Sequence, residues 1–311
     1  MLKKKDKILI TGQEGMVGSY IYKLLKKKNY KIIECKRSQL DFTNYKSTLN
    51  FFKKKKPTIV INAAGKVGGI LDNSKFPIEY LNTNIKIGMN IINISYLSNV
   101  RTLINLGSAC IYPKITKLPI KEKFLLSGYL ESTNEGYALA KIVTLKLCEY
   151  YKKTKKKNFI SLQPANLYGE NDNFDLNSSH VIPALIRKFY EAKKKSKNYV
   201  KIWGSGKNKR EFMHVEDLAE GIFFLLKRKE SLQDSFYNIG SNEEVSIMNV
   251  AKIIKKISNF NGKIITDKSR PKGQVRRVLD SSRINSLGWE KKISLVDGLK
   301  HVYKYYEQIH K

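Results

Sequence analysis

Three glycines spaced three residues apart, Gly12, Gly15 and Gly18, lie between a short apolar run at residues 7–11 and an amphipathic stretch at residues 16–27. The apolar run predicts a buried strand, and the stretch after the glycines predicts a helix. A strand that turns tightly into a helix begins a βαβ unit, because neighbouring parallel strands must be joined by a crossover. The chain is therefore expected to fold around a parallel sheet.

The same alternation of strands and helices continues through the first 165 residues. Further strands are predicted at residues 31–35, 58–62, 102–106 and 159–163, and further helices ending near residue 56 and over residues 78–98 and 134–153. This order predicts an α/β fold with a doubly wound parallel sheet of the Rossmann type.

Beyond residue 165, loops rich in Asn, Asp, Ser and Gly separate shorter predicted helices over residues 183–195, 215–229 and 247–258. We interpret this half as a smaller α/β lobe that covers the carboxyl ends of the strands, where ligands bind in such folds. Residues 1–165 are expected to form the nucleotide-binding domain. Residues 166–311 are expected to form mainly the substrate lobe, with segments that return to the first domain.

The composition favours a folded cytoplasmic protein. Of the 311 residues, 41% are apolar, which excludes a wholly disordered chain. No apolar stretch approaches the roughly 18 residues of a membrane span, and the amino terminus lacks the pattern of a signal peptide. Cys35, Cys110 and Cys148 show neither a disulfide pattern nor metal-ligand spacing, so we expect a reducing compartment and no metal.

The net charge of +32 raises the question of nucleic acid binding. Lysines make up 50 of the 59 basic residues and occur in scattered runs, whereas base-reading domains rely on arginine. A polyanionic small molecule such as a nucleotide sugar is the favoured partner, without specific nucleic acid binding. A non-catalytic nucleic-acid-binding or scaffold protein built on the same fold remains the alternative from another class.

The glycine segment also predicts a dinucleotide site. Glycines allow a close backbone approach, and the helix amino terminus offers N–H donors to a pyrophosphate. The second strand ends in Arg37, a cation suited to the 2′-phosphate of NADP. We therefore expect NADP(H), with contacts from Gly12, Gln13, Glu14, Gly15, Met16, Val17 and Gly18, and from Arg37, Leu40 and Asp41 near the second strand.

A reducing centre is predicted from three further residues. Tyr137 and Lys141 are four residues apart on one predicted helix and so share a face. A lysine ammonium beside a phenol favours the phenolate, which makes the tyrosine a usable acid and base. Ser108 follows the fourth strand, where its hydroxyl can bind a substrate carbonyl. Together with the glycine loop, the set resembles the catalytic residues of the short-chain dehydrogenases of the extended type.

Longer motifs narrow the resemblance to the GDP-L-fucose synthase family, nearly end to end from residue 8 to about residue 298. They are AGKVGGI at 64–70, GSACIYP at 107–113, NDNF at 171–174, NSSHVIPAL at 177–185, WGSG at 203–206 and REF at 210–212. The resemblance implies epimerisation of GDP-4-keto-6-deoxy-D-mannose at C3 and C5, followed by NADPH reduction at C4. It implies Cys110 as the base and His180 as the acid, both residue types that can titrate near neutrality.

The resemblance also assigns binding residues. It implies cofactor contacts from Ala63, Ala64, Lys66, Leu106, Gly107, Lys141, Pro164, Asn166, Leu167 and His180, and sugar-nucleotide contacts from Lys188, Trp203, Arg210 and Lys272. A homodimer is expected through the helices at residues 78–98 and 134–153, as in relatives.

Four positions depart from the family pattern, and three of them bear on ligand contacts; the fourth, Gly136, replaces a proline. Ala109 replaces a serine, Glu14 replaces an arginine of the glycine loop, and Lys272 replaces an aspartate. The first and third leave the identity of the sugar open, so the same mechanism acting on a colitose or 6-deoxy-heptose precursor remains an alternative.

Overall fold

The computed structural model describes residues 1–228, 232–267, 269 and 275–310. Its larger lobe is built on a six-stranded sheet in which all pairs are parallel, in the order β2-β1-β3-β4-β5-β9. The strands are β1 (Lys7–Thr11), β2 (Lys31–Ile33), β3 (Ile59–Asn62), β4 (Thr102–Leu106), β5 (Asn158–Pro164) and β9 (Phe236–Ile239).

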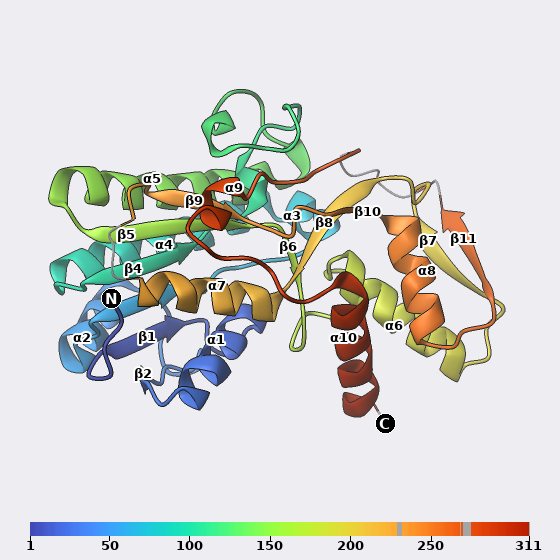
Figure 1. Ribbon diagram of the computed structural model, residues 1–311, viewed down its shortest axis with the longest axis horizontal. Coiled ribbons are helices and arrows are strands. Elements are labelled where there is room, and N and C mark those ends of the chain that lie inside the picture. The colour runs from blue at the N-terminus through green and yellow to red at the C-terminus, as the bar shows by residue number, and fades with distance from the viewer. Residues whose placement is uncertain (229–231, 268, 270–274, 311) are drawn as a thin grey trace.

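Helices cover both faces of this sheet (Figure 1). One face carries α1 (Met16–Lys27) and α7 (Val215–Lys227), which pack together over apolar side chains of the central strands. The other face carries α2 (Tyr45–Lys55), α4 (Pro77–Leu97) and α5 (Glu135–Lys155). These two helical layers confirm the predicted doubly wound α/β fold. The helix expected over residues 215–229 lies on the large sheet, not in the smaller lobe.

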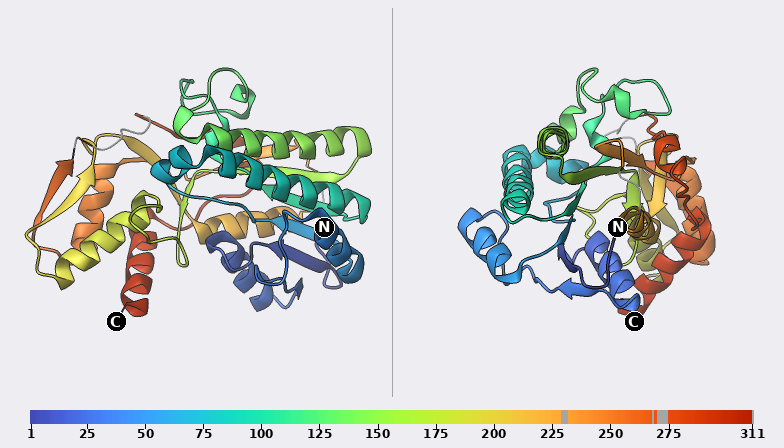
Figure 2. Two further views of the ribbon diagram at one scale, coloured as in Figure 1. Left: turned by 180° about the vertical axis from the view of Figure 1, so that it is seen from behind. Right: turned by 60° about the vertical axis from the view of Figure 1, so that its left-hand side comes forward.

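The smaller lobe contains two short sheets and three helices, at the opposite end of the molecule from α2 (Figures 1 and 2). A three-stranded sheet has the order β10-β8-β6, and a parallel pair joins β11 to β7. The strands are β6 (Asn166–Tyr168), β7 (Tyr199–Trp203), β8 (Lys209–His214), β10 (Glu244–Ser246) and β11 (Lys263–Asp267). The helices, which share a separate apolar core, are α6 (Val181–Lys194), α8 (Ile247–Ile257) and α10 (Leu295–Ile309).

Short helical segments occur in the connections: one between β3 and α4, three between β4 and α5, and one between β11 and α10. They are α3 (Ile70–Lys75), η1 (Ala109–Ile111), η2 (Glu122–Phe124), η3 (Ser132–Asn134) and α9 (Ser282–Asn285). The sequence patterns predicted none of them. In the described part of the chain, no helix has the length and apolarity that a membrane crossing requires.

A row of buried polar side chains crosses the large sheet near the carboxyl ends of its strands. Thr11 donates to Asn62 over 2.8 Å, and Asn62 donates to Asn105 over 2.8 Å. Asn105 and Gln163 then both donate to the hydroxyl of Ser161. Buried polar groups that are fully paired in this way fix the relative positions of the strands they join. We call this row the polar ladder.

Candidate active site

The glycine loop forms a cradle at the point where the strand order reverses. Gly12 has a φ of +69°, which favours glycine, and a Cβ at this position would lie 2.8 Å from the carbonyl oxygen of Ala63. Gly15 precedes α1, whose first turn contains no acidic residue. The cradle therefore presents unopposed helix N–H groups next to the β1–β3 crevice, and these residues fit a dinucleotide pyrophosphate.

Side chains of the cradle are bonded to the backbone after β2. Gln13 accepts from the N–H of Cys35 over 3.2 Å, and Glu14 accepts from the N–H of Arg37 over 2.9 Å. The Arg37 side chain is exposed. Leu40 and Asp41 were also expected to contact the cofactor. The Leu40 side chain packs in the core, and the Asp41 carboxylate accepts hydrogen bonds from Thr43. Neither of these contacts involves the cradle.

Ala63 and Ala64 form the opposite wall of the crevice. Both are bonded to Thr11 at the end of β1, Ala63 through the Thr11 carbonyl and Ala64 through its hydroxyl. The backbone of Lys66 is fixed by Asn84, and its ammonium lies 5.0 Å from the centre of the Tyr80 ring. This wall thus combines two small side chains with one cation.

Ser108, Tyr137 and Lys141 come together beyond β4. The Lys141 ammonium donates to the carbonyl of Leu106 over 2.8 Å and lies 5.6 Å from the centre of the Tyr137 ring. Burial lowers the pKa of Lys141 to about 8. Burial raises the pKa of Tyr137 above its ordinary value, and hydrogen bonding with Ser108 acts in the opposite direction. The geometry fits a proton donor supported by a cation and a hydroxyl.

The backbone of Ser108 is held by the polar ladder, because its N–H donates to Gln163 over 3.0 Å. Gly107 is required here, since a Cβ would lie 1.9 Å from the Gln163 oxygen. Pro164 ends β5 beside this point. Asn166 donates to the carbonyl of Glu211, and Leu167 packs in the large apolar core.

Cys110 lies on η1, directly after Ser108, and its backbone N–H donates to the Ser108 hydroxyl. Its sulfur accepts a hydrogen bond from the Asn134 amide over 3.2 Å. The Arg277 guanidinium donates to the carbonyls of Ala109 and Tyr112, one at each end of the turn. Arg277 is therefore fastened to the segment that carries the thiol.

Two cations face this thiol. Burial lowers the pKa of Arg210 to about 10, the charge of Arg277 acts in the same direction, and the Cys110 sulfur opposes both. Burial also lowers the pKa of Arg277, again opposed by Cys110. The two guanidinium groups therefore place positive charge near the sulfur of Cys110.

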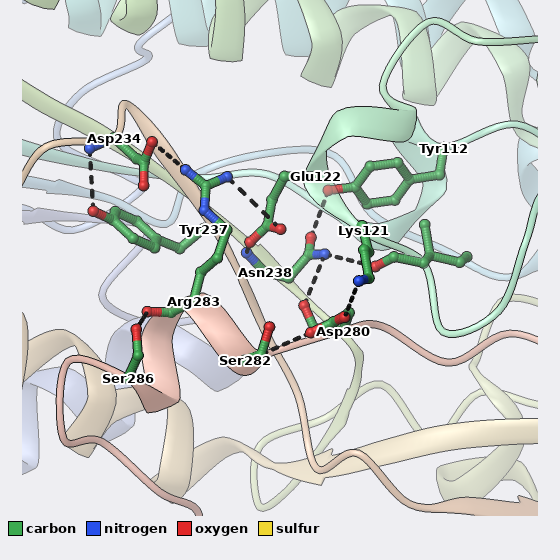
Figure 3. Close-up of polar contacts among 11 residues, drawn as sticks. Tyr112, Lys121, Glu122, Asp234, Tyr237, Asn238, Asp280, Ser282, Arg283 and Ser286 are labelled. Atoms are coloured by element: carbon green, nitrogen blue, oxygen red, sulfur yellow. Dashed lines mark hydrogen bonds and ion pairs between the residues drawn. The ribbon is translucent and has the colours of Figure 1, made fainter.

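A polar network holds the segment that follows Cys110 in the chain, beginning at Tyr112 (Figure 3). The Tyr112 hydroxyl donates to Asn238 over 2.5 Å, and the N–H of Asn238 donates to Glu122 over 3.0 Å. Arg283 forms ion pairs with both Glu122 and Asp234. The network joins β9 and α9 to the segment beyond η1, so the turn that holds Cys110 is anchored in the larger lobe.

His180 precedes α6 on a different segment. The loop before it is fastened to the residues after β3, because Gly69 donates to the carbonyl of Ser178 over 2.8 Å. The His180 side chain is exposed at the surface of the site. Desolvation by the surrounding protein nevertheless lowers the pKa of its imidazole.

The residues expected to bind the sugar nucleotide divide into two places. Lys188 and Trp203 lie together in the smaller lobe, with the ammonium 5.4 Å from the centre of the indole ring. Arg210 lies with Cys110, as described above. Lys272 lies outside the described residues.

The sequence patterns missed three residues that contact this site: Asn134, Gln163 and Arg277. Asn134 is the only one with a local signal, because it lies three residues before Tyr137. Arg277 is separated from Ala109 by 168 positions, and no pattern in the sequence links the two.

With this geometry in place, comparison with known proteins identifies the family. The model of the NAD dependent epimerase/dehydratase family matches residues 8–240. The chain belongs to this family. A GDP-L-fucose synthase of Sinorhizobium fredii is 46% identical over 298 residues, covering 96% of this chain and 94% of the relative. The predicted resemblance is thereby confirmed.

Two further relatives act on other sugars, as their names state. A GDP-L-colitose synthase of Yersinia pseudotuberculosis is 40% identical, covering 96% of this chain and 97% of the relative. The structure of a GDP-mannoheptose C4 reductase from Campylobacter jejuni with NADP bound has a TM-score of 0.90 and 33% identity, covering 99% of this chain and 100% of that one. One scaffold thus serves several GDP-sugars among these relatives.

Proposed function

We propose that the protein is an NADPH-dependent 3,5-epimerase and 4-reductase that converts GDP-4-keto-6-deoxy-D-mannose to GDP-L-fucose. The observation that carries the proposal is that a residue proposed for reduction and a residue proposed for epimerisation lie next to each other on one segment. Ser108, which belongs to the reducing set, and Cys110, which faces two guanidinium groups, are bonded to each other through the Cys110 N–H.

Epimerisation uses the acidity that a C4 ketone gives to the C–H bonds at C3 and C5. Cys110 in its thiolate form removes the proton, and the ketone oxygen carries the resulting charge beside the Ser108 hydroxyl. His180 returns a proton to the opposite face of the ring. Burial lowers the pKa of this imidazole, so its protonated form is a stronger acid than a free imidazolium.

Reduction completes the sequence at C4. NADPH, when bound on the glycine cradle, supplies a hydride to the ketone carbon. Tyr137 donates a proton to the ketone oxygen, and the nearby Lys141 ammonium stabilises the phenolate that remains. We also propose that Arg37 contacts the 2′-phosphate and that Lys188, Trp203 and Arg210 contact the sugar nucleotide.

The test of this function is incubation of the purified protein with GDP-4-keto-6-deoxy-D-mannose and NADPH. Coenzyme oxidation with GDP-L-fucose as the product, identified by NMR, is the expected result. The alternative keeps the mechanism and changes the sugar, as Ala109 and Lys272 and the colitose and heptose relatives suggest. Parallel incubations with those GDP-4-keto sugars decide between the two. Turnover of none of them would refute the enzyme assignment.

A basic nucleic-acid-binding role is the remaining rival. It predicts tight binding in a gel-shift assay that falls steeply with salt, without sugar turnover. The side chains proposed as catalytic favour the enzyme, because a binding module does not require a thiol that interacts electrostatically with two guanidinium groups.

We further propose a homodimer formed through α4 and α5. These neighbouring helices expose large apolar side chains, including Leu97 at 58%, Leu139 and Val143 at 40% and Tyr150 at 57%. One face of α5 carries three of these side chains, Leu139, Val143 and Tyr150. An exposed apolar stripe of this kind is typical of an interface, and we propose that a second copy of the chain buries it. Light scattering after size exclusion tests the mass in solution.

The cytoplasm is the proposed location. Cys35, Cys110 and Cys148 are free thiols, and a catalytic thiol requires a reducing environment. The proposed division of labour places cofactor binding in residues 1–165 and substrate binding mainly in residues 166–311.

A further inference from the structure

A buried carboxylate lies behind the cations that face Cys110. Glu211 follows Arg210 on β8 and keeps only 1% of its surface exposed. Its Oε1 accepts from the N–H of Asn242 over 2.7 Å, and its Oε2 accepts from the N–H of Leu279 over 2.8 Å. Burial raises the pKa of Glu211 to about 7, although these N–H bonds lower it. Such a group is costly to bury and needs its partners.

The surrounding backbone is shaped around this carboxylate. A Cβ at Gly240 would lie 2.2 Å from the Glu211 Oε1, so the loop after β9 approaches the oxygen as closely as only glycine allows. On the other side, residues 275–279 run along β8. The N–H of Lys209 donates to the carbonyl of Val275, and the N–H of Glu211 donates to that of Arg277. Glu211 thus joins three segments that are distant in sequence.

The segment held in this way carries Arg277. Its backbone is bonded to Glu211 at residue 277 and, through the carboxylate, at Leu279. Its guanidinium is bonded to the carbonyls at both ends of the Cys110 turn. Ile120 also pairs with this end of the segment: its N–H donates to the carbonyl of Val278, and its carbonyl accepts from the N–H of Asp280. Loss of the Leu279 bond would remove the contact that joins this end to β8, and we expect it to loosen the position of the guanidinium.

We propose that Glu211 is a positioning residue for proton transfer at Cys110: its carboxylate fixes the backbone at Leu279 and thereby holds the Arg277 guanidinium on the turn that carries the thiol. The polar ladder of the larger lobe holds the backbone of Ser108. In this proposal, Glu211 on β8 of the smaller lobe gives comparable support to the turn that carries Cys110. The positioning role of Glu211 rests on the proposed role of Cys110, but its first readout requires no sugar substrate.

The experiment measures the rate at which iodoacetamide alkylates each cysteine of the full-length protein, followed by mass spectrometry. Only the thiolate reacts, and Cys35 and Cys148 are buried internal references. In Glu211→Gln, one of the two N–H groups loses its acceptor. We expect the alkylation rate of Cys110 to fall about tenfold, because the Arg277 guanidinium would no longer be held on the turn that carries the reacting sulfur.

Asp217 supplies a matched control. It is also buried, with 4% of its surface exposed, and it also accepts two backbone N–H bonds, from Lys292 and Ile293. We expect Asp217→Asn to lower thermal stability in the same way while the alkylation rate of Cys110 stays at the wild-type value. A similar loss of alkylation in both variants would show general loosening and overturn the proposal.

A double-mutant cycle tests the route through Arg277. Arg277→Gln alone should lower the Cys110 alkylation rate, and adding Glu211→Gln should have no further effect, because both act through one guanidinium. Additive losses, or unchanged alkylation in a folded Glu211→Gln, would contradict the proposal. If Glu211→Gln does not fold, Arg277→Gln decides, since wild-type alkylation in that variant also contradicts it. Failure to turn over any GDP-sugar would refute the proposed function without affecting these rates.

Discussion

The carboxylate of Glu14 accepts a hydrogen bond from the backbone N–H of Arg37 over 2.9 Å. A negative charge is thereby fixed at the end of β2, where the adenosine ribose of a dinucleotide binds. We expect Arg37 to favour the 2′-phosphate of NADPH and Glu14 to oppose it, so that the two residues act on the coenzyme preference in opposite directions.

The first prediction concerns this balance. Glu14→Gln removes the charge and should raise the ratio of kcat/KM for NADPH over NADH about tenfold, because one unit charge near a phosphate is worth about 1 kcal/mol or more. Steady-state kinetics with both coenzymes measures the ratio. Glu34→Gln is the control, since Glu34 is bonded to Tyr22 instead and should leave the ratio unchanged. An unaltered ratio in Glu14→Gln would show that its charge does not reach the coenzyme.

The second prediction separates reduction from epimerisation. Tyr137→Phe removes the proton donor, so NADPH oxidation should fall by about 10²- to 10⁴-fold. Exchange of solvent deuterium into C3 and C5, followed by NMR, should continue because Cys110 and His180 remain. Tyr129→Phe, at an exposed position, is the control for loss of a phenol. Loss of exchange in Tyr137→Phe would place the tyrosine in both steps.

The third prediction removes the proposed base. Cys110→Ser should lower deuterium exchange at C3 and C5 by about 10²- to 10⁴-fold, because a hydroxyl is far less acidic than a thiol. Cys148→Ala, which removes a thiol from the core under α5, should exchange at the wild-type rate. Normal exchange in Cys110→Ser would assign the base to another residue.

The fourth prediction follows from the pKa of Lys141, which burial lowers to about 8. Below this pH the ammonium form stabilises the Tyr137 phenolate, and above it the charge is lost. The rate of reduction should therefore fall as the pH rises through about 8. Lys141→Arg, which keeps its charge at higher pH, should move this alkaline limb upward. A limb at the same pH in that variant would belong to another group.

The fifth prediction concerns association. Val143→Glu places a charge in the exposed apolar stripe of α5 and should convert a dimer to a monomer in light scattering. Thr154→Glu adds the same charge to an exposed position near the end of that helix and should leave the mass unchanged. A monomeric wild-type protein would refute the proposed dimer.

Local sequence patterns predicted the elements whose signals lie within one segment. The glycine loop, five of the six strands of the large sheet and the Tyr137–Lys141 helix face follow from local patterns, and the structure has all of them with ends shifted by at most two residues. β2 is shorter than expected and ends at Ile33, where the backbone turns to bind Gln13 and Glu14.

Long-range contacts were beyond those patterns. β9 has four residues and returns to the large sheet beside β5, and α7 packs on α1, although both occur in the half expected to form the smaller lobe. Arg277 contacts the Cys110 turn, and Glu211 contacts the backbone at Leu279, only after three distant segments have packed together. The spacing of apolar residues along one segment predicts a helix or a strand, but it does not specify which distant segments pack together.

The polar ladder runs from the strand that feeds the glycine cradle to the residue that holds Ser108. The distance between the phosphate cradle and the reducing serine is therefore set within one rigid layer of the larger lobe. Lys188 and Trp203 belong to other segments that have their own core. If Lys188 and Trp203 contact the sugar nucleotide, as proposed, substitutions at these positions can change the accepted sugar without altering the distance between the glycine cradle and Ser108.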